Sequence, residues 1–204
     1  MGSDMQKKPE ILPFFPLSVF LLPGEDLPLR IFEPRYMQLI GEVRTQGNTF
    51  AIPYVKGTEI QEFGCEVRRK EVVAENPGGR MVITVQSVAV IRVVNFKKKM
   101  DGKLYGGGAI LRIPCSDPVE SPELKSLIQE YRENFDHDFL SCCQQAGFTR
   151  QDVMKALNLP SDDKFRFISL PNGREKESFL AGQIRYLKLI RKQENQLGSD
   201  FAMN

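Results

Sequence analysis

Residue types that carry chemistry gather most closely near the middle of the second half of the chain, where Asp136, His137 and Asp138 are followed by Cys142 and Cys143. Carboxylate and imidazole groups bind metal ions, and a thiolate next to a base is a nucleophile. Consecutive residues of a helix point about 100 degrees apart, however, so the first three side chains do not converge on one ion. The only histidine of the chain also lies on the same expected helix as the two cysteines. We therefore expect a solvated helix face with inert thiols, no catalytic residue, no metal ion and no cofactor.

The cysteine pattern and the apolar runs indicate in which cellular compartment the chain is expected. The four cysteines form no Cys-x-x-Cys pair, which argues against a structural zinc site. No run approaches the roughly 20 apolar residues of a membrane span, and no charged and apolar leader opens the chain. We expect reduced cysteines, a cytoplasmic location and no membrane partner.

Two basic runs, Arg68-Arg69-Lys70 and Lys97-Lys98-Lys99, are the features that could contact phosphates. The formal net charge is only +2, and aromatic residues that would stack on bases are scarce near both runs. We interpret the runs as solvated charge and do not expect nucleic acid, although an RNA-binding protein stays open as an alternative. The glycine run 106–108 lacks the strand-to-helix context of a phosphate loop, and we expect a β-bulge or a close backbone approach there.

The first half of the chain is expected to be rich in β-structure. Prolines at 13, 16, 23 and 28 exclude a long helix in the opening segment. Runs rich in Val, Ile and Phe predict further strands over residues 50–55, 65–73, 81–96 and 104–113. The turn-forming residues at 76–79 and 97–102 predict two hairpins. One helix is expected among the strands, because Pro34 is followed by apolar residues at helical spacing and then by Gly47.

The second half of the chain changes to helical periodicity. Ser121, Pro122 and Glu123 are typical of a helix start, and Thr149 with Asp152 predicts a capping box for the next helix. A short helix is expected after Ser161, and a last one over residues 174–193, weakened at Gly182 and followed by a polar tail. The sequence therefore predicts a β half followed by a helical half.

The segment from Phe15 to Tyr36, FPLSVFLLPGEDLPLRIFEPRY, resembles the opening signature of the amino-terminal domain family of Lon proteases. Residues 63–67 and 79–85 are similar to paired strands of that family, and residues 175–187 are similar to its closing helices. The resemblance implies an α+β fold, in which an amino-terminal PUA-like β pseudo-barrel with one inserted helix is followed by a carboxy-terminal helical bundle. We place the β-rich subdomain at residues 10–116 and the helical subdomain at 117–195, with flexible tails at 1–9 and 196–204.

The resemblance also implies a function in binding. In Lon proteases this domain helps to select polypeptide substrates, while ATPase and Ser-Lys protease domains carry the catalysis. Neither domain fits in 204 residues, and no Gly-x-x-x-x-Gly-Lys-Ser/Thr loop occurs. We expect a non-catalytic module that recognises polypeptide segments or a protease, as an adaptor or regulator in proteolysis. An RNA-binding PUA-like protein and an enzyme with a site in a cleft are the alternatives, and the oligomeric state stays open.

Two groups of residues are candidates for particular roles. Phe14, Phe15, Phe20 and Leu22 are the peptide-binding candidates, because this segment holds more large apolar groups than one strand face buries. Burial of the same residues explains them equally well.

The second group belongs to the family signature and is interpreted as fold-determining: Pro23, Gly24, Phe32, Glu33, Pro34, Arg35 and Tyr36. The Glu33 carboxylate is expected to accept hydrogen bonds from the first amides of the helix, and Arg35 to pair with a carboxylate or a carbonyl.

Overall fold

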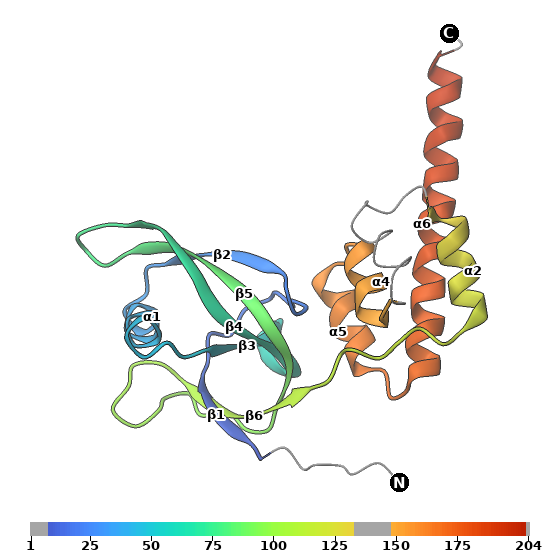
Figure 1. The fold of residues 1–204 in the computed structure, drawn as a ribbon. Helices are drawn as coiled ribbons and strands as arrows, with labels where there is room; N and C mark the ends of the chain where they lie inside the picture. The colour runs from blue at the N-terminus through green and yellow to red at the C-terminus, as the bar shows by residue number, and fades with distance from the viewer. Residues whose placement is uncertain (1–7, 133–147, 203–204) are drawn as a thin grey trace. The chain divides into compact units, whose positions relative to one another are not determined.

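The structure, a computed structural model, describes residues 8–132 and 148–202. The chain divides into two compact units, residues 1–114 and 115–204 (Figure 1). We call them the sheet unit and the helical unit. The candidate residues Asp136, His137, Asp138, Cys142 and Cys143 lie outside the described part of the chain.

Over residues 8–114, the sheet unit is a six-stranded antiparallel sheet with one helix. Its elements are β1 (Glu10–Pro13), β2 (Asp26–Ile31), α1 (Pro34–Gln46), β3 (Phe50–Lys56), β4 (Glu59–Glu75), β5 (Met81–Val93) and β6 (Gly107–Ile113). The strands follow the order β1-β6-β5-β4-β3, and β2 pairs with β5 beside this path. Figure 1 shows β4 and β5 running together as a long hairpin.

The sheet curls because the chain after β1 reaches back to β3. The Phe15 N–H donates to the Ala51 carbonyl over 2.8 Å, and the Val55 N–H donates to the Leu17 carbonyl over 2.9 Å. These contacts join the two ends of the strand order. The expected PUA-like pseudo-barrel in an α+β fold is thereby confirmed. The strand expected from residue 65 begins earlier, at Glu59, because Gly57 with a φ of 63° forms a turn between β3 and β4.

Helix α1 forms where the sequence predicts it. Pro34 occupies its first turn, and Gly47 ends it in the left-handed conformation with a φ of 68°. One face of the helix is buried, and the Phe15 ring stacks on Tyr36 with centroids 3.9 Å apart. Leu39, Ile40 and Val43 of α1 face this core. The strands contribute further side chains to it, among them Leu29, Ile31, Phe50, Ile52, Val67, Ile83 and Val85.

A buried ion pair stabilises the middle of the sheet. Glu66 on β4 is 2% exposed and accepts hydrogen bonds from Thr49 Oγ1 at 2.6 Å and from Arg112 Nε at 2.5 Å. Arg112, on β6, is partly exposed and also contacts Glu10. Burial opposes ionisation of Glu66, but the hydrogen bonds from Arg112 and Thr49 outweigh it, so the pKa of this carboxyl lies below its ordinary value.

The helical unit contains α2 (Pro122–Glu130), α4 (Arg150–Ala156), α5 (Ser161–Ser169) and α6 (Gly173–Ala202). Ser121 caps α2 by accepting from the Leu124 N–H, and Thr149 with Asp152 forms the expected capping box of α4. Helix α6 continues through Gly182 and past the expected end at Gln193 into the segment predicted as a tail. Glycine costs a helix only about 1 kcal/mol, and a helix of this length bridges one such position. Among the described residues, no helix combines the length and apolar character needed to cross a membrane.

Candidate functional site

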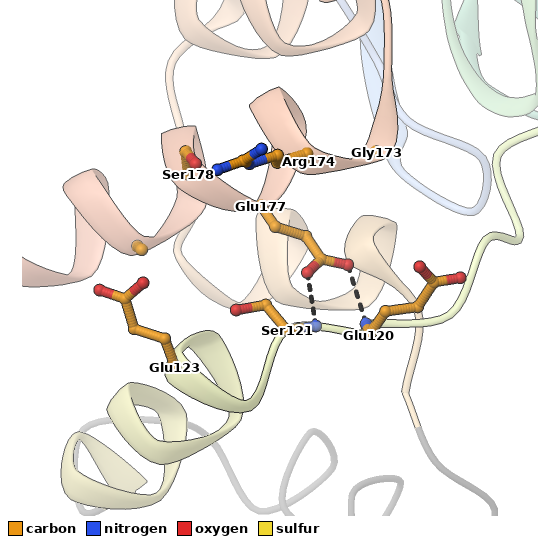
Figure 2. A pocket seen from close by; sticks show the side chains of 8 residues that line it. Glu120, Ser121, Glu123, Gly173, Arg174, Glu177 and Ser178 are labelled. Carbon is orange, nitrogen blue, oxygen red and sulfur yellow. Dashed lines mark hydrogen bonds between the residues drawn. The ribbon is translucent and has the colours of Figure 1, made fainter.

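A polar pocket lies in the helical unit, where the start of α2 meets the first turns of α6 (Figure 2). We call it the helical pocket. It has a volume of about 470 Å³ and is lined by Glu120, Ser121, Glu123, Gly173, Arg174, Glu177, Ser178 and Ala181.

Glu177 is the centre of this pocket. Its carboxylate accepts the Glu120 N–H at 2.8 Å and the Ser121 N–H at 2.6 Å (Figure 2), and also Arg150 Nε at 2.9 Å. The residue is only 5% exposed. Burial opposes its ionisation, but the three donors outweigh that effect, so the pKa of Glu177 lies below its ordinary value. Glu177 is therefore an ionised structural group that connects α6 to the chain before α2 and to α4.

Arg150 completes this connection. Its side chain is 9% exposed and also lies 3.3 Å from Asp117. A Cβ added at Gly173 would lie 2.6 Å from Arg150 Nη2, so a larger residue where α6 begins would displace the guanidinium group. The sequence predicted the caps of α2 and α4 but not this contact between Arg150, Gly173 and Glu177.

The remaining groups of the helical pocket offer little chemistry. Glu123 pairs with Arg185, and Ser121 Oγ is used as a helix cap. Arg174, Ser178 and the exposed Glu120 carboxylate are left, and no side-chain hydrogen bond joins Ser178 to a carboxylate among the described residues. Among residues 8–132 and 148–202, no group of three or more His, Cys, Asp and Glu side chains could hold a metal ion.

A second pocket lies on the outside of the sheet unit, where β2 ends beside the β4–β5 hairpin. We call it the outer-face pocket. It has a volume of about 330 Å³ and is lined by Arg30, Ile31, Phe32, Ala74, Glu75, Asn76, Arg80, Met81 and Val82.

The strand register explains this set of residues. Arg30 on β2 pairs with Val82 on β5, and Val82 pairs with Ala74 on β4, so the three side chains stand side by side across the sheet. Alternation along the strands places Phe32 and Arg80 on the same face. Ile31 points the other way and is buried. The pocket is thus a feature of the outer sheet face.

The charges and apolar groups of the outer-face pocket are available to a ligand. Phe32 is 63% exposed. Neither Arg30 nor Arg80 has an ion-pair partner among the residues that the structure describes. Glu75, the carboxylate in the lining, pairs with Arg44 at 3.1 Å.

A third pocket, of about 320 Å³, lies where β1, β6 and the chain after β5 meet. Its lining includes Ile11, Asn95, Lys97, Met100 and Gly108. A Cβ at Gly108 would lie 2.0 Å from the Asn95 carbonyl oxygen, so the close backbone approach expected at the glycine run is present.

A family model described as the substrate-binding domain of ATP-dependent protease La (LON) matches residues 11–197. The chain belongs to the Lon substrate-binding domain family. A search of curated proteins found no match.

Solved structures agree with this family fold. A Lon N-terminal domain protein from Xanthomonas campestris has a TM-score of 0.65 and 24% identity, over 84% of this chain and 98% of that one. The N-terminal domain of a Mycobacterium avium complex Lon protease has a TM-score of 0.51 and 13% identity, over 87% of this chain and 96% of that one.

The four peptide-binding candidates of this Lon-family chain are buried. Phe14 and Phe15 are part of the sheet unit's core. Phe20 packs edge-on against Tyr54, and Phe20 and Leu22 are 0% exposed. Burial therefore accounts for all four positions, and the exposed patch that the sequence suggested is not present. A role for them in peptide binding would require this segment to open, and stays a prediction.

The signature residues of the Lon family divide between core and surface. Tyr36 is buried under α1, and Gly24, with a φ of 94°, forms the turn after Pro23. The expected cap by Glu33 is wrong, because its carboxylate accepts from Arg35 Nε at 2.8 Å instead of from the helix amides. Phe32, interpreted as a fold residue, lies in the outer-face pocket.

The two basic runs differ in their contacts. Arg68 donates to Gln86, and Lys70 pairs with Asp26. Lys97, Lys98 and Lys99 are exposed in the connection between β5 and β6. The nearby Phe96 ring stacks on Phe14, so its inner side is occupied by the core.

Proposed function

We propose that this chain binds extended polypeptide segments at the outer-face pocket and acts as a substrate-recognition module. The observation that carries the proposal is Phe32, a large aromatic side chain that is 63% exposed beside an apolar pocket floor. Exposed apolar surface of this kind is typical of binding sites. Membership of the Lon substrate-binding domain family supports a polypeptide as the ligand.

The shape of the site supports an extended segment. The pocket lies across β2, β5 and β4. Val73, next to Ala74 in the irregular part of β4, is another exposed apolar residue, with an exposed fraction of 60%. A peptide lying across β2 and β5 would insert one side chain against Phe32, Ala74 and Val82. Apolar pockets for single side chains are the usual source of specificity in such binding.

We propose further that the module serves as an adaptor or regulator in proteolysis, in the cytoplasm. Its partners would be polypeptide segments or a protease that receives them. The thiols of Cys65 and Cys115, the cysteines within the described residues, are compatible with a reducing compartment. We expect the intact chain to recover a protease from a lysate, and this recovery should resist salt and nuclease. The Phe32→Ser variant should not recover the protease. Nuclease-sensitive recovery of RNA would contradict it.

The binding site is tested with a labelled peptide that has a Leu- and Phe-rich centre and neutral Gly/Ser flanks. Fluorescence anisotropy should show binding to the intact chain. Phe32→Ser should weaken the affinity about tenfold, because a large part of one aromatic side chain no longer contributes burial.

Leu104→Ser is the matched control. Leu104 is 53% exposed in the same unit but does not line the outer-face pocket. Its substitution should leave the affinity unchanged. Equal losses in the two variants, or no loss in Phe32→Ser, would contradict the proposed site.

A further inference from the structure

We propose that the outer-face pocket selects segments in which a carboxylate lies close to a large apolar side chain, so that the substrates of this chain are acidic as well as apolar. This inference rests on the proposed function and adds the chemical class of the substrate. It follows from the two arginines in the pocket lining, Arg30 and Arg80.

The two arginines are charged groups without a structural task in the sheet unit. Both side chains are exposed, and neither has an ion-pair or hydrogen-bond partner for its guanidinium among the described residues. An arginine that stabilises a fold is normally paired, as Arg112 is with Glu66 and Glu10. Arg30 and Arg80 differ in this respect from Arg68, Arg92 and Arg112 of the same sheet, which contact Gln86, Glu62 and Glu66, respectively.

The neighbouring carboxylates do not neutralise the pocket. Glu75, in the lining, is held by Arg44, and Asp26, at the other end of β2, is held by Lys70. Both pairs are within the sheet unit and leave the two pocket arginines uncompensated. The lining of the outer-face pocket therefore has two unpaired arginines, while its one carboxylate, Glu75, is paired.

The positions of the arginines match one extended ligand. Ile31 pairs with Met81, so carrying this register one residue further sets Phe32 opposite Arg80. Arg30 lies two residues before Phe32 on the same face of β2. Phe32 thus lies between two arginines on this face, and a guanidinium group can hold a carboxylate through two parallel hydrogen bonds.

The apolar floor distinguishes this ligand from nucleic acid. Val82 and Ala74 line the pocket with aliphatic groups, and Phe32 is the one aromatic side chain in the lining. Single-stranded nucleic acid is typically bound by several aromatic rings along a basic groove. A peptide with an apolar residue between acidic ones satisfies both the floor and the arginines.

The experiment compares three labelled peptides with the same Leu- and Phe-rich centre and with Asp, Asn or Lys in the flanks. In anisotropy titrations of the full chain at low salt, the affinity for the Asp peptide should be about threefold to tenfold higher than for the Asn peptide, because two partly exposed ion pairs are added. The Lys peptide should bind more weakly than the Asn peptide. Added salt should reduce the preference.

The variant Arg30→Gln/Arg80→Gln should remove the preference while the Asn peptide keeps its affinity. Lys98→Gln/Lys99→Gln removes the same charge from exposed positions outside the pocket and should keep the preference. Equal binding of the Asp and Asn peptides to the intact chain would overturn this inference but not the proposed function. The inference would also be overturned if the arginine variant kept the preference for the Asp peptide, or if the lysine control lost it.

Two further outcomes distinguish failure of this inference from failure of the proposed function. Failure of all three peptides to bind would overturn the proposed function and this inference together. Displacement of the Asp peptide by a single-stranded oligonucleotide at concentrations below those of unlabelled Asp peptide would overturn the inference in favour of nucleic acid.

Discussion

The helical pocket and the outer-face pocket use their charged side chains in opposite ways. In the helical pocket, Glu177 is satisfied by two backbone amides and by Arg150, and Glu123 pairs with Arg185. In the outer-face pocket, Arg30 and Arg80 have no such partners among the described residues. The first pocket consists mainly of groups that hold the fold, and the second leaves charge and apolar surface for a ligand.

The difference follows from the secondary structure of the two units. Strands are positioned by the backbone hydrogen bonds of their neighbours, so side chains on the outer face of the sheet are not needed to hold it. Helices satisfy their backbone internally and must be held to each other by side chains. Glu177 performs this task for α6, α4 and the chain before α2.

Substitution of Glu177 should have the largest effect. Glu177→Ala leaves Arg150 buried without its carboxylate and two backbone amides without an acceptor. We expect the free energy of unfolding to fall by about 3–5 kcal/mol, as for other broken buried ion pairs. Urea unfolding followed by circular dichroism measures the loss, and hydrogen exchange should locate it in α2, α4 and α6.

Glu120→Ala is the control for this comparison. The Glu120 side chain is 76% exposed and lies 3.9 Å from Arg150, so its loss should change stability by less than about 0.5 kcal/mol. Similar effects of the two substitutions would contradict the structural role of Glu177.

Glu66→Ala should have a smaller effect in the sheet unit. Glu66 is as buried as Glu177, but its partner Arg112 is partly exposed and keeps Glu10. Water can therefore solvate the arginine that remains, and we expect a loss of about 1–3 kcal/mol. Urea unfolding of the two glutamate variants side by side makes the comparison, and a larger loss for Glu66→Ala would reverse the order.

Acid should weaken both units through these glutamates. Burial opposes ionisation of Glu177 and Glu66, yet hydrogen bonds to their carboxylates set both folded-state pKa values below the ordinary 4.5. Their contribution is therefore complete above pH 4.5 and is lost as the pH falls through the folded-state pKa. The urea midpoint should fall on acidification, and less steeply in Glu177→Gln than in the unmodified chain. An equal slope in both proteins would contradict this assignment.

Arg30→Gln/Arg80→Gln should have the smallest effect on stability. Both side chains are exposed and unpaired among the described residues, so the free energy of unfolding should change by less than about 0.5 kcal/mol. The same urea experiment measures it. A loss comparable with that of Glu66→Ala would mean that these arginines support the fold, and the contrast between the two pockets would disappear.

Local signals in the sequence were sufficient to predict much of the fold. Thr149 and Asp152 are three residues apart, so their capping box follows from sequence spacing, and Gly47 ends α1 as its position predicts. Glu33 failed as a cap because the neighbouring Arg35 competes for its carboxylate.

Contacts between distant residues could not be predicted in the same way. Arg150 and Glu177 are separated by 27 positions, and the chain has many other acidic and basic residues that could pair. Arg30 and Arg80 meet only through the register of β2 on β5. Phe14 and Phe32 are both large apolar residues in the sequence, but only the pairing of the strands beside them decides which is buried and which is exposed.

The most direct test of the outer-face pocket is an NMR titration of the isotope-labelled chain with the Asp-flanked peptide. We expect the largest amide shift changes at Ile31, Met81 and Val82, with Arg174 and Ser178 of the helical pocket unchanged. Largest changes at Arg174 and Ser178, with the outer-face amides unaffected, would contradict the assignment of polypeptide binding to the sheet unit.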